Sequence, residues 1–233
     1  MPFVLAVCSQ KGGSGKSTVV TGLADALVQS AQRVLVLDAD APQHTLLRWY
    51  GEAHKLPKFA SLIVEAAPGA DLHKRRWPAA DTVIIDCPGR LDGVVRSALA
   101  AADALLVPLQ PTYPDSWALS GLAETVHAAV QARKRPLPAF VVLNRLKPRT
   151  RLAKQADGLG QLLPNGFQML DTRLRDLQGF QVAMGSGDTP LGLDPTGPAA
   201  ADLRQLAAEL LTHTRKTHGT DTRSPSSLRH QSR

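Results

Sequence analysis

A short segment near the start of the chain has the composition of a phosphate-binding loop. Residues 11–18 read Lys-Gly-Gly-Ser-Gly-Lys-Ser-Thr. Glycines let backbone N–H groups converge on phosphate oxygens, and the start of a helix adds a favourable dipole. The segment matches the end of the G-x-x-x-x-G-K-[ST] pattern, with Gln10 at the position of the first glycine. We therefore expect a nucleotide phosphate site here.

Each residue of this segment has an expected task. Lys16 would reach the β- and γ-phosphates, and the Ser17 hydroxyl would bind Mg²⁺. The expected nucleotide ligands are Gly12, Gly13, Ser14, Gly15, Lys16, Ser17 and Thr18.

Five short apolar runs are expected to be the strands that position these groups. They span residues 3–8, 33–38, 82–87, 104–109 and 139–144, and they alternate with helical patterns at 16–31, 43–50, 92–102, 115–132, 150–163 and 199–212. Near-continuous apolar strands that alternate with helices predict an α/β fold. We expect a doubly wound, mostly parallel sheet with helices on both faces. We read residues 185–198 as a long loop.

Polar side chains follow the apolar runs. Asp38, Asp86 and Asn144 come at or near the ends of three predicted strands, and Asp40 comes two residues after Asp38. Functional groups of open parallel sheets lie at the carboxyl ends of their strands, which is where the glycine-rich segment also falls. We expect these side chains to share one site.

Composition excludes several classes of protein. The chain has 233 residues, of which 43% are hydrophobic, enough for one ordinary domain. Its two cysteines exclude a disulfide framework and a four-cysteine metal site. No apolar run approaches the ~20 residues of a membrane span, and the first residues do not resemble a signal peptide. A reducing, cytoplasmic setting is expected.

The net charge of +7 is distributed unevenly. Residues 213–233 hold five basic residues and one acidic residue, and we expect this tail to be disordered beyond a domain of residues 1–212. Within that domain, residues 133–154 hold eight basic residues and no acidic one. Such a cluster is either a solvated helix end and loop or a surface that faces an anionic partner.

The octapeptide at 11–18 resembles the deviant Walker A box of the ParA/MinD family of ATPases. That family consists of P-loop ATPases that dimerise around ATP, and its box carries an extra lysine at the position of Lys11. The resemblance implies that Lys11 reaches the phosphates bound by the partner subunit of a homodimer, and hence that it is catalytic. A cation in trans can act like an arginine finger.

The resemblance extends to the acids and to the fifth strand. Asp40 matches the family's water-positioning acid, although Ala41 intervenes before Pro42, so Asp38 is the alternative. Asp38 would lie near Mg²⁺, and Asp86 resembles the Walker B acid that holds the metal through a water. Asn144 matches the residue that contacts adenine. ATP and Mg²⁺ are thus the implied cofactors.

The tail distinguishes between branches of that family. It has no apolar face for membrane targeting, which favours the ParA branch over the MinD branch. The short ParA type implies an ATP-bound dimer that binds duplex DNA non-specifically and associates with the nucleoid. A small ParB-like or cargo-adaptor protein would stimulate hydrolysis and so position a plasmid, a chromosome region or an organelle such as a carboxysome. The expected DNA ligands are Arg145, Lys147, Arg149, Arg151 and Lys154.

Two other functions use the same loop. Short relatives of this family include accessory proteins of DNA transfer and processing, and other P-loop proteins are metabolic enzymes that activate a carboxylate with ATP. Sequence-specific footprinting would indicate the first alternative. A pocket for a second substrate would indicate the other.

Overall fold

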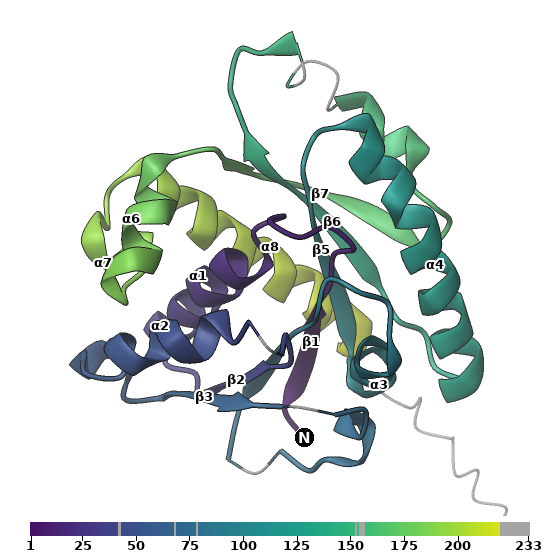
Figure 1. Ribbon diagram of the computed structural model, residues 1–233, viewed down its shortest axis with the longest axis horizontal. Coiled ribbons are helices and arrows are strands. Elements are labelled where there is room, and N and C mark those ends of the chain that lie inside the picture. Colours follow the sequence, from purple (N-terminus) through teal and green to yellow (C-terminus); the bar gives the residue numbers. More distant parts are fainter. Residues whose placement is uncertain (42, 68, 78, 152, 154–156, 220–233) are drawn as a thin grey trace, which may run out of the picture.

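The centre of the protein is a seven-stranded sheet in which every strand pair is parallel. The computed structural model describes residues 1–219 except 42, 68, 78, 152 and 154–156 (Figure 1). The strand order is β3-β2-β4-β1-β5-β6-β7, so β1 lies at the centre. The strands are β1 (Phe3–Val7), β2 (Val34–Asp38), β3 (Leu62–Ala66), β4 (Thr82–Asp86), β5 (Ala104–Leu109), β6 (Ala139–Leu146) and β7 (Phe167–Arg175).

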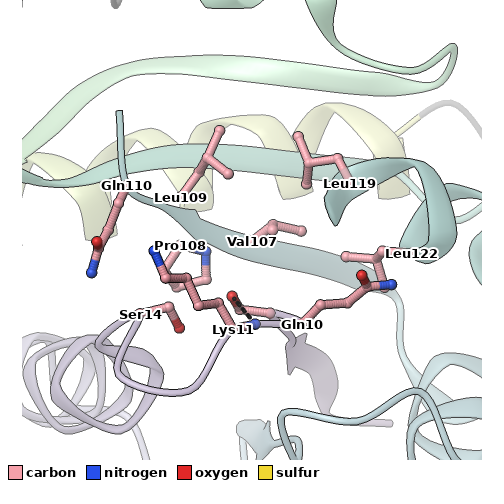
Figure 2. A pocket seen from close by; sticks show the side chains of 10 residues that line it. Gln10, Lys11, Ser14, Val107, Pro108, Leu109, Gln110, Leu119 and Leu122 are labelled. Atoms are coloured by element: carbon pink, nitrogen blue, oxygen red, sulfur yellow. Dashed lines mark hydrogen bonds between the residues drawn. The ribbon is translucent and has the colours of Figure 1, made fainter. Parts of the chain in front are cut away.

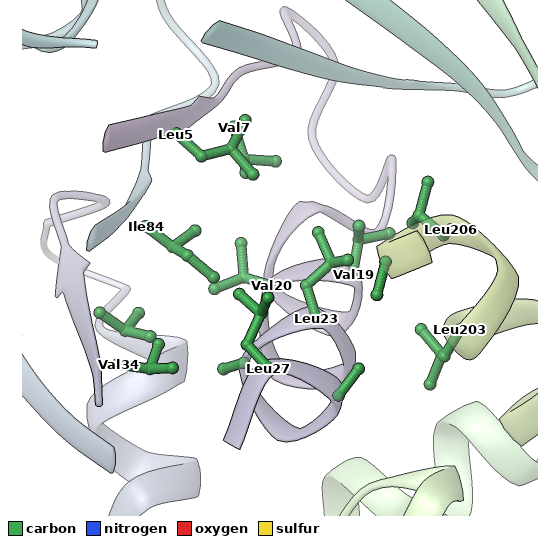
Figure 3. Close-up of a cluster of buried hydrophobic side chains, with 14 of the residues drawn as sticks. Leu5, Val7, Val19, Val20, Leu23, Leu27, Val34, Ile84, Leu203 and Leu206 are labelled. Atoms are coloured by element: carbon green, nitrogen blue, oxygen red, sulfur yellow. The ribbon is translucent and has the colours of Figure 1, made fainter. Parts of the chain in front are cut away.

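Helices cover both faces of the sheet, because the side chains of each buried strand alternate between two apolar cores. Val4 and Ala6 of β1 belong to the core under α3 (Gly93–Ala101) and α4 (Tyr113–Arg133). Leu5 and Val7 belong to the core under α1 (Lys16–Gln29) and α8 (Pro198–Gly219). In the second core, α1 packs between the strands and Leu203 and Leu206 of α8 (Figure 3). The other described α-helices are α2 (Thr45–Ala53), α6 (Gln178–Ser186) and α7 (Pro190–Leu193).

Three 3₁₀ helices complete the described elements: η1 (Pro57–Phe59), η2 (Leu72–Lys74) and η3 (Asp157–Leu162). In the part of the chain that the structure describes, no helix is long and apolar enough to cross a membrane.

The predicted doubly wound α/β fold is confirmed, and all five predicted strands are present. The edge strands β3 and β7 were not predicted, because polar or exposed side chains interrupt both: Ile63 of β3 is 53% exposed. The single helix predicted over 150–163 is confirmed in part: Arg151 and Ala153 are α-helical, the 3₁₀ helix η3 follows, and residues 152 and 154–156 lie outside the described residues. The 185–198 loop contains α7, and α8 continues past residue 212 to Gly219.

The contact between α1 and α8 depends on a glycine. A Cβ added to Gly22 would lie 2.7 Å from Cδ1 of Leu203 and closer still to Cδ2. Leu203 is fully buried, so its side chain has little room to move away. The two helices can therefore pack this closely only while position 22 lacks a side chain.

We predict that Gly22→Ala destabilises the protein by about 1–2 kcal/mol, because overpacking outweighs the better helix propensity of alanine. In a Leu203→Ala background, where the obstructing methyl groups are gone, the same change should be neutral or stabilising. Urea denaturation of the four proteins of this cycle measures both effects. An equal cost of Gly22→Ala in both backgrounds would contradict the packing argument.

Candidate functional site

The carboxyl ends of β1, β2, β4, β5 and β6 bring the predicted site residues to one edge of the sheet. Residues 8–15, which we call the P-loop, connect β1 to α1. Gly15 has φ +87°, and a Cβ there would lie 2.5 Å from Nδ2 of Asn144. That same Nδ2 donates a hydrogen bond of 2.7 Å to the carbonyl of Ser14. The end of β6 therefore holds the P-loop in place, and only glycine fits at the point of contact.

The P-loop borders an open hollow of about 460 Å³, which we call the P-loop hollow. Lys16 lines it and is only 6% exposed, and the hydroxyl oxygen of Ser14 is buried with no hydrogen-bond partner among the described residues. Glycines and the first turn of α1 form most of the wall. The lining residues are Gly12, Gly13, Gly15, Lys16, Ser17, Thr18, Asp40, Gln43, Thr45, Gly89, Arg145 and Met184.

A buried carboxylate lies beside this hollow. Ser17 Oγ donates a 2.8 Å hydrogen bond to Oδ2 of Asp86, while Oδ1 of Asp86 has no hydrogen-bond partner in the described part of the chain. Burial raises the pKa of Asp86 to about 7, although the Ser17 hydrogen bond and the charge of Lys16 act in the opposite direction. A hydroxyl beside a carboxylate with a free oxygen is an oxygen donor set that suits Mg²⁺.

The two acids after β2 have different surroundings. Asp38 is opposite Asp86 in the pairing of β2 with β4, and it is 1% exposed. Its Oδ2 accepts the backbone N–H groups of Leu46 and Leu47, both at 3.1 Å, and its Oδ1 accepts that of Asp40. Asp38 thus fixes the start of α2, a task that the sequence analysis did not predict. Asp40 is half-buried and lines the P-loop hollow.

Lys11 lies apart from the P-loop hollow of its own chain. It is exposed, and its side chain extends toward Pro108 at the end of β5 (Figure 2). It lines a narrow crevice against β5, in which Gln110 Nε2 donates to the carbonyl of Gly13 at 3.2 Å. Lys11 therefore faces the edge of the site rather than its centre.

A second hollow of about 220 Å³ joins the first, and we call it the α6 hollow. One wall comes from α6, which the sequence analysis missed although Phe180, Gln181 and Met184 have helical spacing. Its lining residues are Gly15, Thr18, Val19, Asn144, Arg145, Arg175, Asp176, Leu177, Phe180, Gln181 and Met184. The mixture of apolar and hydrogen-bonding side chains suits a flat heterocycle.

Asn144 is placed to serve both the P-loop and this hollow. Its Oδ1 accepts the backbone N–H of Arg145 at 2.9 Å, in addition to the bond that its Nδ2 donates to Ser14. A primary amide has a second N–H and a second lone pair. These could bind a ligand in the α6 hollow while the loop stays attached.

The basic cluster at 133–154 is divided between the two ends of β6. Arg133 and Arg135 donate to the carbonyls of Leu99 and Ala102, before β6 begins, so they do not share a surface with the residues that follow β6. Arg149 and Arg151 are exposed beyond its far end, as is Lys147, which pairs with Asp176 at 3.6 Å. Lys154 lies outside the described residues. A single surface spanning 133–154 is therefore wrong.

Comparison with known proteins agrees with this geometry. The model of the CobQ/CobB/MinD/ParA nucleotide-binding domain matches residues 5–191. The chain is 30% identical to the "maintenance of carboxysome distribution protein A" of Halothiobacillus neapolitanus over 213 residues, which are 90% of this chain and 96% of the relative. It is 29% identical to the chromosome-partitioning ATPase Soj of Thermus thermophilus, covering 89% and 94%.

A solved structure shares the fold. The septum site-determining protein MinD of Pyrococcus horikoshii, solved with Mg-ADP, superposes with a TM-score of 0.73 at 18% identity. The match covers 96% of this chain and 100% of that one.

The raised pKa of Asp86 gives a stability that depends on pH. Asp86 has the ordinary carboxyl pKa of 3.8 in the unfolded state and a pKa of about 7 in the folded state. Between these two pH values the folded state binds more protons than the unfolded state, so the free energy of unfolding falls as the pH rises. We predict that, in EDTA, Asp86→Asn is more stable than the wild type, and by about 2 kcal/mol more at pH 8 than at pH 5. Urea denaturation across this range measures the difference. A difference that does not change with pH would show that Asp86 is not a buried charge.

Proposed function

The chain belongs to the CobQ/CobB/MinD/ParA nucleotide-binding family, and from that premise we propose that it is an ATP-driven positioning ATPase. ATP would close a homodimer, and the closed dimer would bind duplex DNA without sequence preference. Hydrolysis, stimulated by a cargo-bound adaptor, would release the dimer from the DNA. One observation carries the proposal: a glycine-rich loop, Lys16 and the Ser17–Asp86 pair line or border one open hollow.

The nucleotide would lie across the two hollows. Gly12, Gly13, Gly15 and Thr18 would surround its phosphates, Lys16 would contact the β- and γ-phosphates, and the base would enter the α6 hollow beside Asn144. Mg²⁺ would be held by Ser17 and by Asp86 through a water, and it would supply positive charge to the phosphates. Asp38 would lie near the metal and its waters, since it is opposite Asp86 in the sheet, while its oxygens also accept backbone N–H groups at the start of α2.

Asp40 is the proposed water-positioning residue. It lines the P-loop hollow together with Gly12 and Lys16, whereas the carboxylate of Asp38 is used to hold the start of α2. A carboxylate at this place can accept a hydrogen bond from an attacking water and orient it toward the γ-phosphate.

Lys11 is the proposed contact between subunits. Its exposure and its place outside its own P-loop hollow support a role toward the partner's nucleotide. A lysine brought to the phosphates by a second subunit would neutralise the charge that develops in the transition state. Dimerisation would then be a condition of hydrolysis.

The proposed DNA surface consists of Lys147, Arg149 and Arg151. All three are exposed beyond the carboxyl end of β6, at the same edge of the sheet as the nucleotide site. A dimer would double the number of phosphate contacts, and binding would weaken steeply with salt. Such binding would keep the ATP-bound protein on the nucleoid.

For the cargo we propose a class of object and not one particular object. Relatives of similar identity bear names that refer to carboxysome distribution and to chromosome partition, so a protein organelle, a chromosome region and a plasmid all fit. The alternatives of DNA transfer and of carboxylate activation would use the same nucleotide site. They would differ in sequence-specific DNA binding or in a requirement for a small-molecule acceptor.

The proposal is tested by DNA retention with Mg²⁺ and either ATP or ADP. We predict that the wild type is retained on DNA of unrelated sequences with ATP and not with ADP. Lys16→Ala should lose nucleotide binding because it removes the buried cation of the hollow. Lys11→Ala should still bind nucleotide but should lose the ATP-dependent dimer and hydrolysis, as measured by light scattering and phosphate release. Retention that is equal with ATP and ADP, or confined to one DNA sequence, would contradict the proposal.

The DNA surface is tested separately by charge reversal. The double variant Arg149→Glu and Arg151→Glu should lose DNA retention at least tenfold at moderate salt, because it replaces attraction to phosphate by repulsion. Its affinity for ADP should stay unchanged. The control is Arg76→Glu with Arg96→Glu, two exposed arginines elsewhere on the surface that make the same change of net charge. Equal effects of the two double variants would mean that only the total charge matters.

A further inference from the structure

Arg145 lies at the junction between the two hollows. It follows Asn144 near the end of β6, where the pairing with β7 shifts register, and its φ is +54°. Non-glycine residues rarely adopt this left-handed conformation. Here the hydrogen bond from the Arg145 N–H to Asn144 Oδ1 supports it. The amide that holds the P-loop therefore also fixes the direction in which the Arg145 side chain leaves the strand.

The guanidinium lies close to the P-loop. Its Nε is 3.9 Å from the position that a Cβ on Gly15 would occupy, and Arg145 lines both the P-loop hollow and the α6 hollow. Gly15, Thr18 and Met184 are the other residues common to both linings. Within the described residues, the Arg145 side chain has no ion pair or hydrogen bond.

The other charged side chains near this junction either have partners within the protein or lie to one side of the junction. Arg175 also lines the α6 hollow, but its guanidinium is bound to Asp202 and to the carbonyl of Pro198. Asp176 pairs with Lys147. Lys16 is buried on the side of the P-loop hollow. Arg145 is therefore the cation left to meet a ligand at the junction of the two hollows, in the part of the chain that the structure describes.

We propose that Arg145 binds the α-phosphate of the nucleotide held by its own subunit. This proposal rests on the proposed nucleotide site. A nucleotide whose base lies in the α6 hollow and whose terminal phosphates lie beside Lys16 must have its α-phosphate at the junction of the two hollows. Arginine can donate two parallel hydrogen bonds to a phosphate. Since ADP and ATP share the α-phosphate, Arg145 would increase affinity for both equally and would not sense the γ-phosphate. This assigns Arg145 to the nucleotide rather than to the DNA expected from the sequence.

Calorimetric titration with adenosine, AMP, ADP and the analogue AMPPNP tests this assignment. We expect Arg145→Gln to weaken AMP, ADP and AMPPNP by a similar factor of about tenfold or more, the size of a lost charge-assisted hydrogen bond, and to leave adenosine unchanged. Arg145→Lys should recover part of the loss, because it restores the charge without the paired geometry. Arg96→Gln, an exposed arginine on α3, is the matched control and should bind all four as the wild type does.

Other results would overturn the assignment. A loss confined to AMPPNP would place Arg145 at the γ-phosphate, and a loss that includes adenosine would place it at the base or ribose. Unchanged nucleotide affinity with lost DNA retention would return Arg145 to the DNA surface. Thermal melting of Arg145→Gln without ligand checks that the fold is intact. If the wild type and Arg96→Gln bound none of the four, the proposed nucleotide function itself would fail.

Discussion

The site depends on one side-chain amide. Asn144 holds the carbonyl of Ser14 through its Nδ2 and the backbone N–H of Arg145 through its Oδ1, while Gly15 packs against it with no room for a Cβ. Residues 12–15 of the P-loop are small and have little side-chain packing of their own. The conformation of this segment is therefore imposed from outside: Asn144 of β6 supplies the shorter restraint, and Gln110, which follows β5, donates a second hydrogen bond to the carbonyl of Gly13. A buried hydrogen bond of this kind is costly to leave unmade, which favours one arrangement of the loop.

The same edge of the sheet holds charges in an environment that disfavours them. Asp86 and Lys16 are almost fully buried, and Oδ1 of Asp86 and Oγ of Ser14 lack partners among the described residues. Burying charged and polar groups without full pairing lowers stability, and proteins keep such arrangements mainly at functional sites. The central strands provide the rigid support, since β1 and β4 are covered on both faces by apolar side chains.

What the sequence could predict follows from where each element lies. Central strands are buried on both faces, so residues 3–8, 82–87 and 104–109 are near-continuous apolar runs that can be recognised in the sequence. The edge strands β3 and β7 carry exposed side chains and lack that pattern. The glycine-rich loop was found because its chemistry is local in sequence. The capping role of Asp38 depends on how the chain turns between β2 and α2, and the place of Arg145 depends on a left-handed backbone conformation. A single sequence displays neither. The basic cluster was misjudged because β6 separates residues that are close in sequence.

The wall of the α6 hollow that α6 forms is held in place by side-chain contacts with other helices. Asp188, between α6 and α7, is the anchor: Lys58 of η1 donates to its carboxylate, and Trp49 of α2 donates to its carbonyl at 2.9 Å. Lys58 also pairs with Asp25 of α1, which is fully buried and accepts from Thr189. The helix that begins at the P-loop therefore also holds the segment that carries Phe180 and Met184. The two halves of the site thus share α1 as a common support: its first turn borders the P-loop hollow, and Asp25 farther along the helix holds the segment after α6.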